Sequence, residues 1–264
     1  MPNRGTKIQN RFDKKSITKT FFIFTLQYNA MNRSYKISYK TYYNNRLKEV
    51  SFHGQTTYPL YVQLTYLRKT IFFKSSMFEL FSRPRYAIEH YKKKNEVPSL
   101  AFVTKKEEAL LDFVVEKCRD DFSLERFKSA YQFYSRDLIL AAEDAFRAFL
   151  IVFMVSKNAS SFGKAFVVGS LKYVLFDILN ESKTIFAPSV YQEMLSNLSK
   201  APPYMELYAF MKHFKRWPDQ VLTLMEWESE GTKAAFSQYI MRHYPEKDVV
   251  HILEEIKQWL DKTV

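Results

Sequence analysis

The chain has 264 residues and a formal net charge of +12, and its hydrophobic content of 47% is ordinary for a globular protein. The length allows one large domain or two smaller ones, and no apolar run is long enough to cross a bilayer. The single cysteine, Cys118, excludes an intramolecular disulfide and indicates a reducing compartment. We therefore expect a cytoplasmic protein without a membrane span.

The excess of basic over acidic residues is confined to the first part of the chain. Residues 1–100 contain 19 Lys and Arg against 5 Asp and Glu, a net of +14, whereas residues 101–264 contain 21 against 23, a net of −2. Such asymmetry indicates a polyanionic partner for the first part, either nucleic acid or an anionic membrane surface.

Residues 1–30 begin polar and basic and then reach a short apolar run, Phe21 to Leu26. The run is too short for a signal peptide, and no small-residue cleavage site follows it. We expect either a flexible basic tail or a chain whose translation starts at Met31.

Three strands are predicted next. Residues 34–41 alternate apolar and polar side chains, and residues 57–75 are two runs of β-branched and aromatic residues that meet at Arg68-Lys69. With Arg68-Lys69 as the turn, Gln63 pairs with Lys74. One face of the sheet is apolar and needs a helix to cover it, and the other face is polar, basic and exposed.

These strands place a basic β-sheet module at residues 31–85, in which residues 43–56 are a loop with a turn at Gly54. Residues 86–103 are interpreted as a linker. Residues 104–264 have helical periodicity throughout. The predicted fold is α+β, a small three-stranded antiparallel sheet module followed by an all-α multi-helix domain.

Cap residues set the expected starts of the first helices. Thr104 with Glu107 predicts a capping box, and Ser123 predicts the cap of a helix over residues 124–134. A long helix over residues 136–155 is apolar on every side near its end, which predicts burial in the middle of a bundle. A similar long helix is predicted over residues 164–179, and shorter helices are predicted over residues 189–198, 204–214, 218–227, 233–243 and 247–259.

Residues Tyr58 to Thr65, with Pro59 near the start of the strand and a hairpin after it, resemble the arm-type DNA-binding domain of tyrosine recombinases. The similarity is to the integrases of mobile elements in Bacteroidetes, and the phrase Asp121 to Phe127 is similar to one that follows their arm domain. The resemblance covers about residues 34–134. It implies a sheet that lies in a DNA groove, with its polar face on the bases and flanking Lys and Arg on the phosphates.

The residues themselves indicate the same face for duplex DNA, since amide and ammonium groups hydrogen-bond base edges and basic groups hold phosphates. The base-facing candidates are Lys36, Ser38, Lys40, Tyr61, Gln63, Thr65 and Lys74. The phosphate candidates are Arg46, Lys48, Arg68, Lys69, Arg83 and Arg85. Alternation alone also fits an ordinary half-buried sheet with a solvated outer face.

The chain departs from the recombinase pattern where that family has its chemistry. His213 and Arg216 match a His-x-x-Arg pair and Tyr244 follows, but the surrounding phrases and an upstream Thr-Gly-x-Arg box are missing. We interpret His213 and Arg216 as the polar face of a surface helix. The sequence has no phosphate-binding loop, no metal-ligand spacing and no Gly-x-Ser-x-Gly elbow, so we expect no cofactor, no metal and no catalysis.

The sequence thus predicts a non-catalytic DNA-binding accessory or regulatory protein, and the resemblance associates it with a mobile element. Two alternatives stay open. One is a helical interaction or scaffold protein whose basic sheet binds RNA or is merely solvated, and the other is a degenerate tyrosine recombinase.

Overall fold

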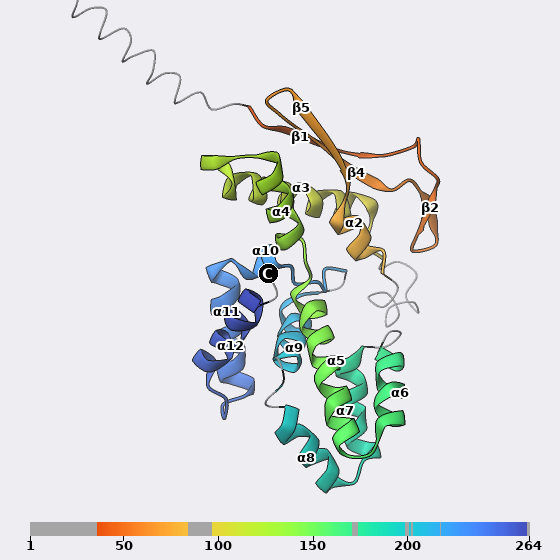
Figure 1. The fold of residues 1–264 in the computed structure, drawn as a ribbon, viewed down its shortest axis with the longest axis vertical. Helices are drawn as coiled ribbons and strands as arrows, with labels where there is room; N and C mark the ends of the chain where they lie inside the picture. Colours follow the sequence, from red (N-terminus) through yellow and green to blue (C-terminus); the bar gives the residue numbers. More distant parts are fainter. Residues whose placement is uncertain are drawn as a thin grey trace, which may run out of the picture.

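A three-stranded antiparallel sheet lies at one end of the molecule, as predicted (Figure 1). The computed structural model describes residues 36–83, 97–170, 174–198, 201, 203–216 and 218–262, so the expected N-terminal tail lies outside the described residues. The strands are β1 (Ser38–Tyr43), β4 (Leu60–Tyr66) and β5 (Lys69–Lys74), in the order β1-β4-β5. The α+β fold, with the sheet preceding a multi-helix part, is confirmed.

The predicted register of the hairpin is wrong by two residues. Leu67 and Arg68 form the turn, with φ of 50° and 64°, so Gln63 pairs with Phe72, whereas the predicted turn at Arg68-Lys69 paired it with Lys74. Two positive φ values are typical of the type I′ turn, whose twist matches that of the strands. The observed register pairs Val62 with Phe73 on the covered face. A slip of two keeps every side chain on its predicted face.

A second, smaller hairpin replaces the loop expected at residues 43–56. Strands β2 (Val50–Phe52) and β3 (Gln55–Thr57) pair around His53 and Gly54, which have φ of 50° and 81°. Phe52 is 2% exposed and stacks on Phe78 with ring centroids 5.2 Å apart. Packing on this helical side chain stabilises strands that are too short for the alternation pattern to reveal.

Three helices cover the apolar face of the sheet. They are α2 (Ser76–Phe81), α3 (Leu100–Lys117) and α4 (Leu124–Tyr134) (Figure 1). They share one hydrophobic core with Leu60, Val62 and Leu64 of the central strand. Residues 36–100 alone would keep α2 but lack α3 and α4, which complete this core.

The cap of α4 is at Ser123, as predicted, but the cap of α3 is not at Thr104. The cap lies five residues earlier, at Ser99, whose hydroxyl accepts a hydrogen bond from the amide of Phe102 at 3.1 Å. Glu107 cannot serve as a capping partner because it is fully buried and faces α2.

Glu107 joins three elements beneath the sheet. Its carboxylate accepts hydrogen bonds from the Ser75 hydroxyl at 2.5 Å, the Met77 amide at 3.1 Å and the Tyr131 hydroxyl at 2.6 Å. The first two donors lie at the start of α2, and Tyr131 belongs to α4. Burial raises the pKa of Glu107 despite these hydrogen bonds. The carboxylate therefore fixes α2 and α4 against α3.

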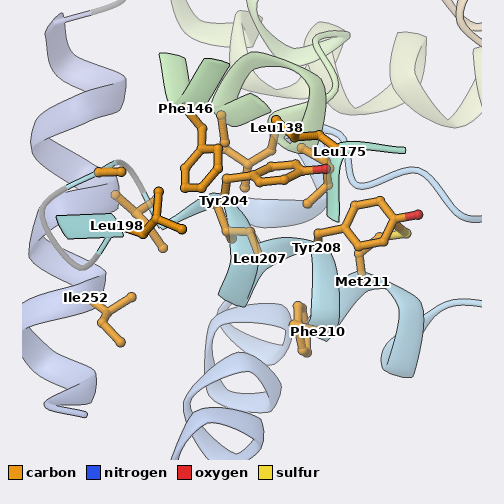
Figure 2. Close-up of a cluster of buried hydrophobic side chains, with 14 of the residues drawn as sticks. Leu138, Phe146, Leu175, Leu198, Tyr204, Leu207, Tyr208, Phe210, Met211 and Ile252 are labelled. Atoms are coloured by element: carbon orange, nitrogen blue, oxygen red, sulfur yellow. The ribbon is translucent and has the colours of Figure 1, made fainter. Parts of the chain in front are cut away.

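The remaining helices enclose a second hydrophobic core and extend away from the sheet (Figure 1). They are α5 (Leu138–Ser156), α6 (Ser160–Ser170), α7 (Leu175–Ile185), α8 (Pro188–Leu198), α9 (Tyr204–Phe214), α10 (Leu224–Trp227), α11 (Glu230–His243) and α12 (Val249–Lys262). In the sheet part, a 3-10 turn, Arg119–Asp121, precedes α4. The long helix predicted over residues 164–179 is divided between α6 and α7. Tyr204, 0% exposed, lies near Phe146, Leu138 and Leu175 (Figure 2).

Helix α5 is buried on one side only, which corrects the expectation that its apolar end is surrounded. Leu150 and Phe153 are 2% and 8% exposed, but Ile151, Val152 and Val155 are 37%, 69% and 53% exposed. A bundle buries a helix only where neighbours contact it. The exposed side chains Ile151, Val152 and Val155 are called the α5 strip below.

A group of four charges connects the two cores. Lys106 of α3 lies 2.7 Å from Asp219 and 3.2 Å from Glu226, and Lys215 lies 2.5 Å from Glu226. Burial alone would raise the pKa of Glu226, but the two lysines hold it below its usual value. These ion pairs and a β-bridge between Asp137 and Thr223 hold part of the segment before α10 in a non-helical conformation. The helix predicted over residues 218–227 is therefore reduced to α10.

Candidate nucleic-acid interface

The outer face of the sheet carries nine side chains in three rows that run across β1, β4 and β5. Strand pairing places residues of the same row directly opposite one another, and opposite residues point to the same face. The rows are Ser38–Thr65–Thr70, Lys40–Gln63–Phe72 and Tyr42–Tyr61–Lys74. This set is called the outer face below.

Six of the seven base-facing candidates lie in these rows, and the seventh, Lys36, is exposed just before β1. The structure therefore brings the predicted residues together on one surface. Three members of the outer face were not among the candidates, namely Tyr42, Thr70 and Phe72. The end of β1 at Tyr43 accounts for Tyr42, because the predicted strand stopped at residue 41.

Few contacts within the described residues occupy the polar groups of the outer face. The hydroxyls of Thr65 and Thr70 are 2.9 Å apart, and the Lys40 ammonium lies 5.9 Å from the ring centre of Tyr42. Lys74 is 3.8 Å from Glu79, with both side chains about 60% exposed. An exposed ion pair of this kind contributes little and exchanges readily for another anion.

The inner face of β1 fixes how the outer face is presented. Tyr39 donates a hydrogen bond to Asp112 of α3, and the Tyr43 hydroxyl lies 3.1 Å from the carbonyl of Leu100. Burial and the neighbouring Asp112 raise the pKa of Tyr39 to about 12, so its hydroxyl stays a donor at neutral pH. Strand β1 is thus held to α3 by directional bonds, which keeps its outward side chains in place.

Basic side chains flank the outer face at both ends of the sheet. Arg68 and Lys69 are exposed at the β4–β5 turn, and Arg46 and Lys48 are exposed in the connection that leaves the other end of β1. Residues 36–83 hold eight Lys and Arg against two Glu. The sheet and its flanks therefore present a positive surface around a polar centre.

Arg83 lies apart from this surface. It is exposed after the end of α2, on the helical side of the sheet, and lines a cleft of about 260 Å³ with Ser76, Arg136 and Asp144. Arg85 lies outside the described residues. Arg83 is therefore not a neighbour of the outer face, and its contact with the same ligand depends on how far that ligand extends.

Two of the recombinase-like residues, His213 and Tyr244, lie on either side of Tyr239 in the second core. The His213 ring lies 5.1 Å from Tyr239, and Tyr239 lies 6.2 Å from Tyr244. His213 and Arg216 are exposed, and Tyr244 is half-buried. Burial, followed by the neighbouring Tyr239, raises the pKa of Tyr244 to about 12. A raised pKa leaves less of the phenol deprotonated at neutral pH, so the side chain would need a base to act as a nucleophile.

The part of the chain that the structure describes shows neither a metal-binding group nor a membrane-spanning helix. No group of three or more His, Cys, Asp or Glu in that part of the chain is placed to hold a metal ion. None of its helices combines the length and the apolar character needed to cross a membrane. Comparisons with protein-family models, with curated proteins and with solved structures find no match to this chain.

Proposed function

We propose that the protein binds duplex DNA through the outer face of its sheet and acts without catalysis, as an accessory or regulatory factor. The observation that carries this proposal is the outer face itself. Polar and basic side chains from three strands share one surface, and exposed Lys and Arg surround it. The resemblance of residues 34–134 to integrase arm domains supports an association with a mobile element.

The dimensions of the sheet favour the major groove. Three strands spaced about 4.8 Å apart place β1 and β5 about 10 Å from each other. The major groove of B-DNA is about 12 Å wide and the minor groove about 6 Å. Alternate residues along a strand are about 6.8 Å apart, close to two base-pair steps of about 3.4 Å. Neighbouring rows of the outer face would then contact the groove two base-pair steps apart.

The chemistry of the rows fits base edges, and that of the flanks fits phosphates. Gln63, in the centre of the central strand, has both a donor and an acceptor for adenine, and Lys40 beside it has donors for guanine. Arg68 and Lys69 at one end and Lys48 at the other are placed to hold the backbone on either side.

The proposal of a non-catalytic role rests on the sequence, because the recombinase phrases around His213 and Arg216 and the upstream Thr-Gly-x-Arg box are missing. A recombinase-like nucleophile attacks a phosphate as a phenolate, whereas the pKa of Tyr244 is raised by burial. We also propose that the protein acts in the cytoplasm, and the buried, unpaired Cys118 supports a reducing compartment.

The test is a salt titration of the full-length chain against duplex DNA, single-stranded DNA and RNA of the same sequence. Affinity for the duplex should be highest and should fall steeply with salt, because each phosphate contact releases counterions. Preference for RNA or for single strands would replace duplex DNA as the ligand, and affinity that is flat with salt would remove the proposal.

A pair of matched variants locates the surface. Lys69→Ala removes one charge beside the outer face, and Lys183→Ala removes one from α7 at the far end of the molecule. Only Lys69→Ala should lower affinity and reduce the salt slope by about one. Equal effects of the two variants would mean that net charge, and not the sheet, drives binding.

One observation favours a competing function, self-association through the helical part. The α5 strip is apolar and exposed, and residues 148–156 contain no charged side chain. A second copy could therefore approach it without like-charge repulsion. Sedimentation of the full chain over a range of concentrations tests this, and Val152→Glu should abolish any dimer. A chain that stays monomeric throughout rejects it.

A further inference from the structure

Phe72 is the residue on the outer face that folding does not explain. Its side chain is 59% exposed at the end of the central row, opposite Gln63. Its neighbours in β5, Ile71 and Phe73, pack against the core beneath the sheet, whereas Phe72 belongs to neither hydrophobic core of the described residues. A large apolar side chain that stays in water forgoes the stabilisation of burial. Its position suggests burial against a ligand.

The major groove offers one apolar group on the base edges, the C5-methyl of thymine. We propose that Phe72 contacts a thymine methyl in the bound duplex and so determines part of the sequence specificity. The inference rests on the proposed binding of duplex DNA and names what the outer face selects. Gln63 lies beside Phe72, and its amide suits adenine, so the central row would read a site that contains adenine and thymine.

An unpaired base stacked on Phe72 is the competing explanation. Surfaces that bind single strands combine several aromatic platforms for successive bases. On this face Tyr42 and Tyr61 are half-buried, and their rings lie 6.4 Å apart and tilted by 42°, so they contact each other. Phe72 is therefore a single exposed ring among polar neighbours, which favours contact with a base edge.

The experiment begins with selection of a duplex by the full-length chain from a random library. Each thymine of the enriched duplex is then replaced in turn by deoxyuridine, which removes only the C5-methyl. At one thymine this should weaken binding about fourfold, the value of burying one methyl-sized group. In Phe72→Ala the same replacement should have no further effect, because the contact is already lost.

Two variants serve as controls. Phe72→Leu keeps an apolar side chain but no ring, so it should retain the deoxyuridine effect if the contact is with a methyl and lose binding if the ring stacks. Met241→Ala removes an equally exposed side chain, 58%, from α11 and should change neither affinity nor the deoxyuridine effect. Circular dichroism confirms that each variant is folded.

The outcomes separate this inference from the function on which it rests. Duplex binding with no sensitive thymine, or with the same sensitivity in Phe72→Ala, overturns the methyl contact and leaves DNA binding intact. A greater loss of affinity for a thymidine single strand than for the duplex in Phe72→Ala also overturns it, in favour of stacking. A chain that binds no duplex removes both proposals.

Discussion

The outer face of the sheet and the α5 strip are both exposed, but they are built from different chemistry. The sheet presents hydroxyls, an amide and ammonium groups on alternate residues, with Phe72 as its well-exposed apolar member. The strip presents the aliphatic side chains of Ile151, Val152 and Val155. Polar groups have directed donors and acceptors, so their arrangement restricts the ligand. An aliphatic surface restricts it much less, because the hydrophobic effect has no direction.

The two regions are also held in place differently. Strand β1 is bonded to α3 through Tyr39 and Tyr43, and α2 and α4 are joined to α3 through Glu107. Helix α5 is held chiefly by packing around residues such as Phe146 and Leu150. Directional bonds fix orientation as well as position. The sheet end should therefore be sensitive to the loss of single polar atoms, and the helical end to the loss of volume.

The largest effect is expected from the polar anchor of the sheet end. Glu107→Ala leaves the donors of Ser75, Met77 and Tyr131 without their acceptor in a buried site. Each buried unsatisfied group costs about 1–3 kcal/mol, so the total loss should be about 3 kcal/mol or more. Urea unfolding measures it. A loss below about 1 kcal/mol would show that water or a rearranged α2 replaces the carboxylate.

The same residue predicts how stability depends on pH. The pKa of Glu107 is raised above 4.5 in the folded chain, so the folded state binds more protons than the unfolded state between the two pKa values. The stabilisation that this difference in proton binding gives the folded state is fully present below pH 4.5. It decreases as the pH rises through the folded-state pKa of Glu107. Relative to the natural chain, Glu107→Gln should therefore gain stability with rising pH. The exposed neighbour, in Glu108→Gln, controls for loss of one carboxylate.

The second prediction compares the two sides of α5. Leu150→Ala and Phe153→Ala should each lower the free energy of unfolding by about 2–5 kcal/mol through lost transfer and a cavity. Val152→Ala, at 69% exposure, should change it by about 0.5 kcal/mol or less. Urea titrations of the three variants measure the difference. If Val152→Ala strongly lowers the free energy of unfolding, but only at high protein concentration, a second copy covers the α5 strip.

The sheet was predictable because two-residue alternation shows which side of a strand is buried. Leu60, Val62 and Leu64 are buried and Gln63 is not, whichever turn closes the hairpin. The turn itself was not predictable, because the segment lacks an Asn-Gly or Asp-Gly pair that would fix it. Packing beneath the sheet therefore decides between registers that differ by two residues. The observed register is the one that pairs Gln63 with Phe72.

The helical part was predictable in its elements but not in its surface. Periodicity and caps located most helices, but a run that is apolar on all sides carries no signal for which side faces a neighbour. The role of Glu107 was also hidden, since a glutamate three residues after a threonine matches a capping box as well as a buried anchor. Only tertiary contacts distinguish these cases.

The third prediction separates reading of bases from simple electrostatics on the outer face. If Gln63 contacts a base, Gln63→Ala should cost about 1–3 kcal/mol on a selected duplex and little on random DNA. Lys69→Ala should weaken both duplexes by similar amounts, because phosphates carry no sequence. Fluorescence anisotropy with both duplexes at fixed salt measures the four affinities. Parallel behaviour of the two variants would identify the sheet as a charged surface without specificity.

The smallest effect is expected at Tyr244, after the end of α11. Tyr244→Phe should leave DNA affinity unchanged, because Tyr244 packs against the second core and is not part of the outer face. It should also leave no covalent intermediate to abolish, because the raised pKa of Tyr244 opposes formation of a phenolate. The assay incubates the full-length chain with a nicked and an intact duplex and looks for a DNA adduct that survives denaturation. Arg216→Ala, which removes an exposed charge near His213, is the companion variant and should also have no effect. An adduct that disappears in Tyr244→Phe would instead place chemistry at the helical end and make the sheet its targeting surface.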